Sequence, residues 1–237
     1  MNINKTIKTL AAVASLAVAG SAFAGPVYQF ERGAGTFGGN GNYGYDSLRA
    51  TYDTDTQDFT WEVDYANDNN DNASTGTSGD TARGGWLVIS NGPNPKRSTS
   101  ELAIFYFDRN TESVFAYAYN GQNNSASWRG MEFLGQFENA YDTMGSISTL
   151  SVNVAAINDA LDLGVQFTDT IGIWFHPAFG NTRLQTNAAG EITNFVPAGQ
   201  VWYDTNNETA YQVPAPATLA LLGMALMGLG LRRRKTA

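Results

Sequence analysis

Short stretches of alternating apolar and polar residues recur along this chain, and turn-forming residues separate them. In residues 59–65 the odd-numbered positions are all apolar, so they share one face of an extended strand. The even-numbered positions are polar and face the other way. Residues 48–52 alternate in a similar way, and the polar residues 53–58 lie between the two stretches. This pattern predicts a β-hairpin with a polar turn.

The same pattern predicts a second hairpin, with strands at 102–107 and 114–119 joined by a turn at 108–111. Further strands are expected at 86–90, 128–133, 147–154, 171–175, 192–195 and 200–203. One short helix is expected at 154–161, with Asn153 as its N-cap. Many short strands with turn signals between them favour an all-β fold, an antiparallel β-sandwich or jelly roll. No internal repeat is found, so residues 25–212 are expected to form a single domain.

Residues 1–24 are typical of a secretory signal peptide. The parts of such a signal follow in order: cations at Lys5 and Lys8, an apolar run over 9–19, and small residues at Ala22 and Ala24 before Gly25. Signal peptidase is therefore expected to make Gly25 the first residue of the mature chain. The alternative is an N-terminal membrane helix that is not cleaved.

The other end of the chain has the reverse polarity. Residues 213–231 carry no charge, and a basic cluster follows directly: Arg232, Arg233, Arg234 and Lys235. Such a run forms roughly 28 Å of helix, which is close to the ~30 Å of a bilayer core. We therefore expect a transmembrane helix whose cations stay in the cytoplasm, with residues 25–212 on the far side of the membrane. The alternative is a core helix of the folded body.

The start of this segment carries a recognisable motif: Val213, Pro214, Ala215 and Pro216. Together with the apolar run and the basic end, residues 213–237 closely resemble the PEP-CTERM sorting signal of exported bacterial proteins. Ala215 stands where that family usually has Glu. The resemblance implies processing by exosortase, a membrane-embedded cysteine protease, and an association with exopolysaccharide and biofilm matrix. Residues 85–96, 102–108 and 116–123 resemble a body type of other PEP-CTERM proteins, which implies no particular chemistry.

Charge and composition exclude several classes of function. The chain has 14 basic and 22 acidic residues, and its formal net charge is -8. The two ends hold six of the cations and none of the acidic residues, so residues 25–212 keep 8 basic and 22 acidic residues, a net charge of -14. Such a body repels nucleic acid and anionic lipid. With no cysteine and a single histidine, disulfides, zinc–cysteine sites and multi-histidine metal sites are excluded.

One acidic loop is a candidate calcium site, because clustered Asp and Asn oxygens are calcium ligands. Its candidate ligands are Asp68, Asn70, Asp71 and Asn72. The loop is not an EF-hand, since Ala73 and Gly79 occupy the positions of the expected Gly and Glu. A solvated loop between strands explains this composition equally well. The turn with Asp53, Asp55 and Asp58 is a weaker candidate of the same kind.

Two candidate catalytic arrangements are also present. Glu62 and Asp64 lie two residues apart on one strand face, like the carboxylates of laminarinase-like jelly-roll glycosidases. The third acidic position of that pattern is Ala66 here, and a solvated hairpin face is the alternative interpretation. His176 is expected to be structural, because it lies beside aromatic residues and the chain has no Gly-x-Ser-x-Gly elbow.

The aromatic residues, 13 Phe, 11 Tyr and 5 Trp, raise the possibility of a sugar-binding face. Tyrosines and Trp128 alternate with Asn, Gln and Ser, and rings that proved exposed would favour carbohydrate binding, whereas buried rings would be core. The sequence thus predicts an exported, non-enzymatic protein, anchored first in the inner membrane and then placed at the cell surface or in the matrix. Its expected partners are signal peptidase, exosortase, the membrane and exopolysaccharide, with no nucleic acid and no cofactor other than calcium. A secreted glycan hydrolase and a calcium-stabilised adhesin are the alternatives.

Overall fold

The computed structural model describes residues 25–39, 43–66, 82–97 and 100–213. Within them, Tyr28–Gln212 form one compact unit. The expected signal peptide, the candidate calcium loop from residue 67 to 81, and the sorting signal from Pro214 onward lie outside the described residues.

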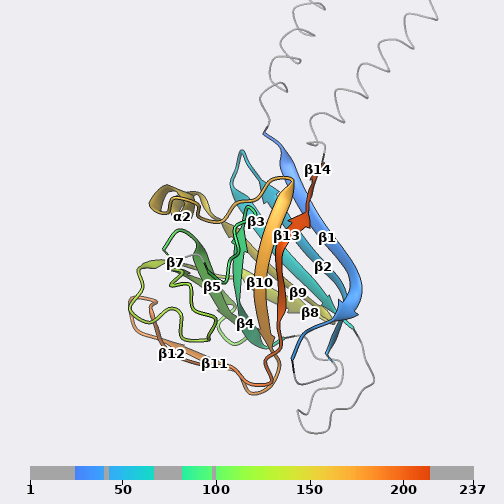
Figure 1. Ribbon diagram of the computed structural model, residues 1–237. Helices are drawn as coiled ribbons and strands as arrows, with labels where there is room; N and C mark the ends of the chain where they lie inside the picture. The colour runs from blue at the N-terminus through green and yellow to red at the C-terminus, as the bar shows by residue number, and fades with distance from the viewer. Residues whose placement is uncertain (1–24, 40–42, 67–81, 98–99, 214–237) are drawn as a thin grey trace, which may run out of the picture. The chain divides into compact units, whose positions relative to one another are not determined.

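Two six-stranded sheets make up this unit, and Figure 1 shows them as two layers. The first sheet has the order β14 (Tyr211–Val213), β1 (Val27–Thr36), β2 (Gly44–Asp53), β3 (Asp58–Tyr65), β9 (Ile147–Asn153) and β8 (Tyr141–Met144). The second has the order β13 (Tyr203–Thr209), β10 (Thr170–Ala178), β4 (Gly84–Ser90), β5 (Ala103–Asp108), β6 (Ser113–Ala118) and β7 (Phe133–Phe137).

The main core lies between the two sheets. The apolar face of β3 is buried there, as its alternation predicts, and the Phe59 ring stacks on Phe105 of the second sheet at 6.1 Å between ring centroids. Trp61 meets Phe175 edge-on at 5.1 Å. Because each buried aromatic side chain contributes roughly 1.5–3 kcal/mol, these contacts hold the two sheets together.

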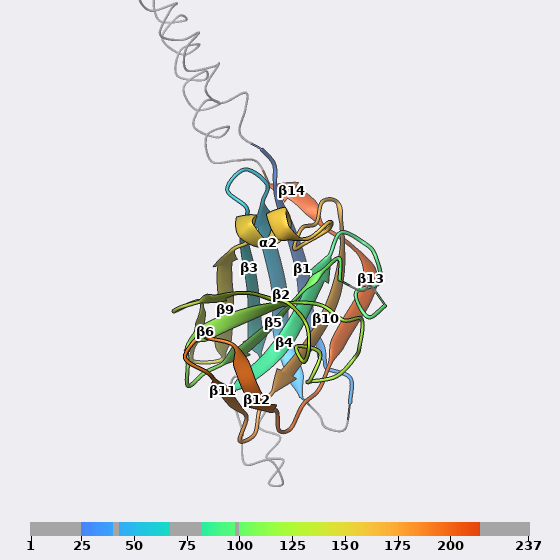
Figure 2. The same ribbon diagram turned by 90° about the vertical axis from the view of Figure 1, so that its left-hand side faces the viewer.

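A second apolar cluster covers the outer face of the second sheet. Every residue of β4, β5 and β6 is buried, which requires cover on both faces of these strands. Part of that cover is a two-stranded hairpin, β11 (Arg183–Thr186) and β12 (Ile192–Val196). Its Phe195 ring contacts Trp86 at 5.8 Å and Tyr106 at 5.4 Å. Figure 2 shows this hairpin at one end of the two-layer body and helix α2 (Ala155–Ala160) at the other.

Both predicted hairpins are confirmed, as β2–β3 and β5–β6, and every pairing in them is antiparallel. The jelly-roll connectivity is not confirmed, because runs of consecutive strands such as β4 to β7 stay within one sheet. The short helix is confirmed, but Val154 is its N-cap, and Asn153 lies one residue earlier, where its side chain accepts a hydrogen bond from the Ala155 amide.

Two strand predictions are wrong in position. Residues 128–130 lie in a turn, where the Arg129 amide donates to the Ala126 carbonyl and Gly130 has a φ of +72°, and β7 begins only at Phe133. The strand expected at 200–203 is in fact β13, which begins where that prediction ends. The sequence pattern also missed β1, whose alternation is obscured by glycines and by exposed residues on both faces.

Candidate functional site

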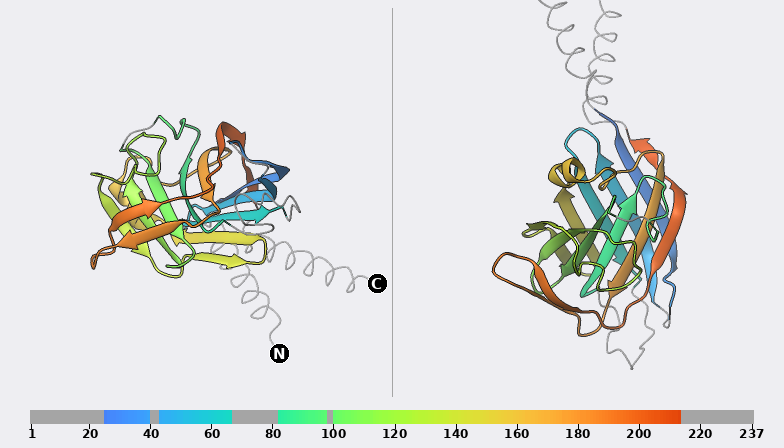
Figure 3. Two further views of the ribbon diagram at one scale, coloured as in Figure 1. Left: turned by 90° about the horizontal axis from the view of Figure 1, so that it is seen from below. Right: turned by 60° about the vertical axis from the view of Figure 1, so that its left-hand side comes forward.

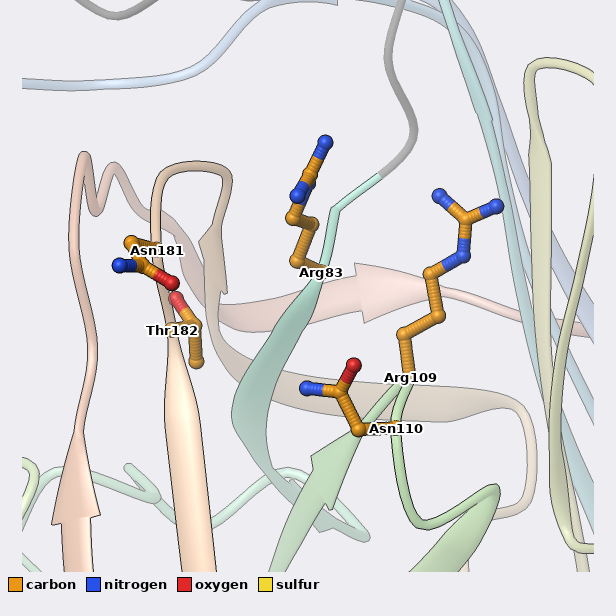
Figure 4. A pocket seen from close by; sticks show the side chains of 5 residues that line it. All are labelled: Arg83, Arg109, Asn110, Asn181 and Thr182. Carbon is orange, nitrogen blue, oxygen red and sulfur yellow. The ribbon is translucent and has the colours of Figure 1, made fainter.

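A polar pocket of about 410 Å³ lies where β4 begins, β5 ends and the β10–β11 loop passes (Figure 4). The described residues that line it are Arg83, Arg109, Asn110, Asn181 and Thr182. Asn181 and Thr182 directly precede β11, so the pocket lies next to the β11–β12 hairpin, which projects from one end of the body in the right-hand view of Figure 3. Each of the five side chains has a hydrogen-bond donor, and two of them are cationic.

The pairing of β4 with β5 brings the two arginines together. Gly84 pairs with Asp108, so Arg83 and Arg109 fall opposite each other one position beyond the last paired residues. The Arg109 amide donates to the Arg83 carbonyl at 2.9 Å. Figure 4 shows both side chains extending in the same direction, away from the strands. Two arginines from neighbouring strands thus line one pocket on a body that is otherwise strongly acidic.

A buried carboxylate, Asp108, joins the two walls of the pocket. One of its oxygens accepts a hydrogen bond from the Asn110 amide at 2.5 Å, and the other accepts one from the Leu184 amide of β11 at 3.0 Å. Burial raises the pKa of this carboxyl group, while the hydrogen bonds from Asn110 and Leu184 oppose the shift. Asp108 therefore ties the β5–β6 turn to the hairpin and fixes the shape of the pocket.

The opposite wall is equally constrained. The Thr182 hydroxyl accepts a hydrogen bond from the Ala198 amide at 3.2 Å, and the Arg83 amide donates to the Ala178 carbonyl at 2.8 Å. A Cβ atom at Gly84 would lie 2.9 Å from the Thr182 methyl group and 2.7 Å from the Phe107 carbonyl oxygen. Only glycine allows β4 and Thr182 to approach this closely, so the pocket depends on Gly84.

The donors in this pocket suit a small anionic group. Guanidinium groups bind carboxylates, sulfates and phosphates through paired N–H donors, and the amides and the hydroxyl add neutral hydrogen bonds. Among the described residues Arg109 makes no ion pair. Arg83 has an interaction of its own, but a guanidinium has five N–H donors and can hold more than one group. The pocket can therefore orient a single carboxylate-bearing ring.

The two carboxylates considered for glycoside hydrolysis are engaged elsewhere. Glu62 accepts a hydrogen bond from Arg49 at 3.1 Å, and Asp64 accepts one from the Ser146 hydroxyl at 2.6 Å. Both belong to the outward-facing positions of β3, and neither lines the arginine pocket.

His176 lies within an aromatic cluster. Its ring stacks on Trp86 at 4.7 Å with an angle of 6° between the planes, and Trp174 meets it nearly edge-on at 4.8 Å. Burial, and secondarily the charge of Lys96, lowers the pKa of His176 from 6.5 to about 4. The ring is neutral near pH 7 and packs as an aromatic group, in agreement with the structural role expected for it.

Among the described residues, the aromatic rings do not form the exposed face that the carbohydrate hypothesis required. Tyr106, Tyr117 and Tyr119 are buried in the outer cluster, and Trp128 is partly buried against it. Trp202, which the sequence did not single out, is 43% exposed. These rings therefore serve mainly as core.

The second acidic turn is a structural motif. One Asp53 oxygen accepts hydrogen bonds from the amides of Asp55 and Thr56, and Asp58 accepts one from the Asn153 side chain. Over the described part of the chain, no group of three or more His, Asp or Glu side chains is arranged to hold a metal ion. The first candidate, at Asp68, Asn70, Asp71 and Asn72, lies outside that part.

Sequence reasoning missed all five residues of the arginine pocket. Arg83 precedes a predicted strand, Arg109 lies in a predicted turn, and Thr182 follows about seventy residues later, so no local motif unites them. The feature that brings the two arginines together is the strand register. When residues 86–90 and 102–107 pair in the observed alignment, Arg83 and Arg109 lie opposite each other.

Comparison with known protein families identifies the PEP-CTERM protein-sorting motif at residues 212–235. The chain therefore carries a PEP-CTERM sorting signal, which supports its assignment as an exosortase substrate and implies an exported, membrane-anchored precursor. No curated protein and no solved structure matches the chain. Within the residues that the structure describes, no helix is both long and apolar enough to cross a bilayer, and the expected spanning segment lies almost wholly beyond them.

Proposed function

We propose that this protein is a non-enzymatic component of the cell surface or extracellular matrix that binds polysaccharide through the arginine pocket. Signal peptidase cleaves the precursor before Gly25, and the C-terminal helix holds it in the inner membrane until exosortase acts at residues 213–216. The sorting motif supports export, and the body then meets exopolysaccharide outside the cell.

The observation that carries the binding proposal is the pairing of Arg83 with Arg109 in a cavity of about 410 Å³, a volume that accommodates a sugar ring. A uronate ring has one carboxylate for the guanidinium groups and several hydroxyls for Asn110, Asn181 and Thr182. The body as a whole carries a charge of -14, so a densely charged polyanion is repelled at long range. The favoured ligand is a polysaccharide whose carboxylates are separated by neutral sugars.

Binding without turnover is the expected behaviour. The carboxylate pair that the sequence offers for a retaining glycosidase is Glu62 and Asp64, and both accept hydrogen bonds from other side chains. Incubation with gellan, whose glucuronates are separated by neutral sugars, should release no reducing ends. Turnover that is lost in Glu62→Gln would instead identify a hydrolase.

The pocket is tested by titrating the full-length chain in nonionic detergent with oligosaccharides prepared from gellan. Arg109→Gln should weaken binding by about tenfold or more, because it removes a charge-assisted hydrogen-bond pair worth roughly 1.5–3 kcal/mol. Arg129→Gln is the matched control, since Arg129 is an exposed arginine that does not line the pocket and lies against the Trp128 ring. Equal losses in both variants, or no binding by the unaltered chain, would refute the proposal.

Processing at the two ends gives a separate prediction. Mass spectrometry of the protein recovered from the cell surface should show Gly25 as the first residue and should lack Arg232–Lys235. The physical reason is that both cleavage signals lie in segments that enter the membrane, where the two proteases act. A surface form that retains the basic cluster would show that exosortase does not process this chain, a result that Ala215 in the motif makes worth examining.

A further inference from the structure

A second pocket lies at the other end of the body, and we propose that it binds a neutral sugar unit. It has a volume of about 320 Å³ and lies between the β2–β3 turn and helix α2. Its walls include Tyr52, Gln57, Asn158, Asp159, Gln166 and Phe167. The inference rests on the proposed function in one respect, namely that polysaccharide is the ligand the body meets.

The turn that forms one wall is built rigidly. Asp53 accepts hydrogen bonds from the amides of Asp55 and Thr56 at 2.8 and 3.0 Å, which closes the turn. Gln57 follows with a φ of +57°, a left-handed conformation that non-glycine residues seldom adopt. It is held there because its amide donates to the Asp53 carbonyl and its carbonyl accepts from Val154. Backbone strain retained by several bonds is common where a protein positions a ligand.

Asn158 of α2 connects this turn to the opposite wall. Its side-chain amide donates to the Gln57 side-chain oxygen at 2.8 Å, and its own oxygen accepts from the Val165 amide at 2.7 Å. It also donates to the Tyr52 hydroxyl at 3.3 Å. Asn158 is thus fully used within the protein, and it orients Gln57 and Tyr52 before any ligand arrives, which lowers the entropy cost of binding.

Two further side chains in the pocket are available to a ligand. Gln166 and Asp159 make no side-chain hydrogen bond with any described residue. The Gln166 side chain offers both donors and an acceptor, and the Asp159 carboxylate offers acceptors only. Their position beside the preorganised wall gives the pocket hydrogen-bonding capacity that the fold itself does not use.

The chemistry of the lining selects a neutral, hydroxylated ring. Amides and hydroxyls both donate to and accept from sugar hydroxyls, and the carboxylate accepts from them. Among the described residues, no lysine or arginine lines the pocket to attract an anion. The Tyr52 and Phe167 rings, whose centroids lie 5.8 Å apart, are buried in the core where it borders the pocket. This lining contrasts with that of the arginine pocket, so the two sites prefer different units of a polysaccharide.

The placement of the two pockets has a consequence for matrix organisation. The arginine pocket lies near the β11–β12 hairpin, and the neutral pocket lies beside α2, at opposite ends of the body in Figures 1 and 2. One body can therefore hold two polysaccharide strands, and linked sites of this kind raise overall avidity well above that of either site.

The test uses the full-length chain in detergent and four neutral probes, hexasaccharides of glucose, mannose, galactose and N-acetylglucosamine. At least one should bind, and Gln166→Ala and Asp159→Asn should each weaken that binding by about fivefold or more. Asp159 is exposed on α2, so its substitution keeps the fold intact even if Gln166→Ala does not. Gln122→Ala, an exposed glutamine outside the pocket, is the control.

The two proposals fail in different ways. Gln166→Ala and Asp159→Asn should leave binding of the gellan oligosaccharides within about twofold of the unaltered chain. Arg109→Gln should leave binding of the neutral probes unchanged. The second site would be overturned if none of the four neutral probes bound at about 10 mM. It would also be overturned if binding survived both Gln166→Ala and Asp159→Asn. Loss of the Arg109 effect alone would overturn the proposed function and leave the neutral site standing.

Discussion

At the scale of single residues, His176 should make the protein sensitive to mild acid. The folded protein holds this ring neutral down to a pKa of about 4, whereas the unfolded chain binds a proton below its ordinary pKa of 6.5. Protons therefore favour the unfolded state as the pH falls from 6.5 towards 4, and up to about 3 kcal/mol of stability is lost across that window. Above pH 6.5 the full contribution is present.

The variant His176→Phe tests this dependence, because phenylalanine preserves a ring beside Trp86 and Trp174 but cannot be protonated. Urea unfolding at pH 7 and at pH 4.5 should show a smaller loss of stability in the variant than in the unaltered chain. Carboxylates titrate equally in both proteins, so the difference between the two losses isolates the histidine. Identical losses would mean that the ring is protonated in the folded state.

At the scale of elements, the β11–β12 hairpin depends on two hydrogen bonds to the sheet beneath it. The Leu184 amide donates to Asp108, and the Ile192 amide donates to the Tyr117 hydroxyl at 2.6 Å. Asp108→Ala leaves the buried Leu184 amide without a partner, which should lower the free energy of unfolding by about 1–3 kcal/mol. Hydrogen exchange should become faster at Leu184 and its neighbours on the hairpin.

An appropriate control for that experiment is Asp46→Ala, which removes an exposed carboxylate from β2. Because Asp46 lies in the other sheet, its loss should not change exchange in the hairpin. If exchange at Leu184 stays slow in Asp108→Ala, the apolar contacts of Phe195 alone hold the hairpin, and the arginine pocket does not need Asp108 for its shape.

Single elements also show what the sequence can and cannot predict. The alternation in β3 identified its buried face correctly, because one face meets the core and the other meets water. The outer cover of β4 to β6 could not be foreseen, since a fully apolar run gives no sign of which element packs on its second face. The strand expected at 128–133 does not form over its first residues, because the turn around Gly130 determines the backbone there.

At the scale of the whole molecule, the C-terminal sorting signal could be recognised from sequence, and the two pockets could not. A sorting signal is linear, so the order of its residues is sufficient to recognise it. Each pocket instead assembles side chains from segments far apart in the chain, such as Arg83 and Thr182, or Tyr52 and Gln166. Only strand register and sheet order, which are tertiary properties, bring those residues together.

The charge of the whole body predicts an unusual dependence of binding on salt. A basic protein that binds a polyanion loses affinity as salt is added, because counterion release drives its binding. Here a body of net charge -14 meets polygalacturonate, a densely charged chain, so the long-range interaction is repulsive even though the arginine pocket attracts one carboxylate. Raising NaCl from about 10 to about 150 mM shortens the screening length from about 30 to about 8 Å.

That screening removes the long-range repulsion and leaves the short contacts of Arg83 and Arg109 largely intact. Binding to polygalacturonate should therefore strengthen with added NaCl, and binding to gellan oligosaccharides, whose carboxylates are sparse, should change little. Arg109→Gln should bind polygalacturonate weakly at every salt concentration. Affinity that falls steadily with salt would show that a basic surface other than this pocket binds the polymer, and isothermal titration at four NaCl concentrations distinguishes the two results.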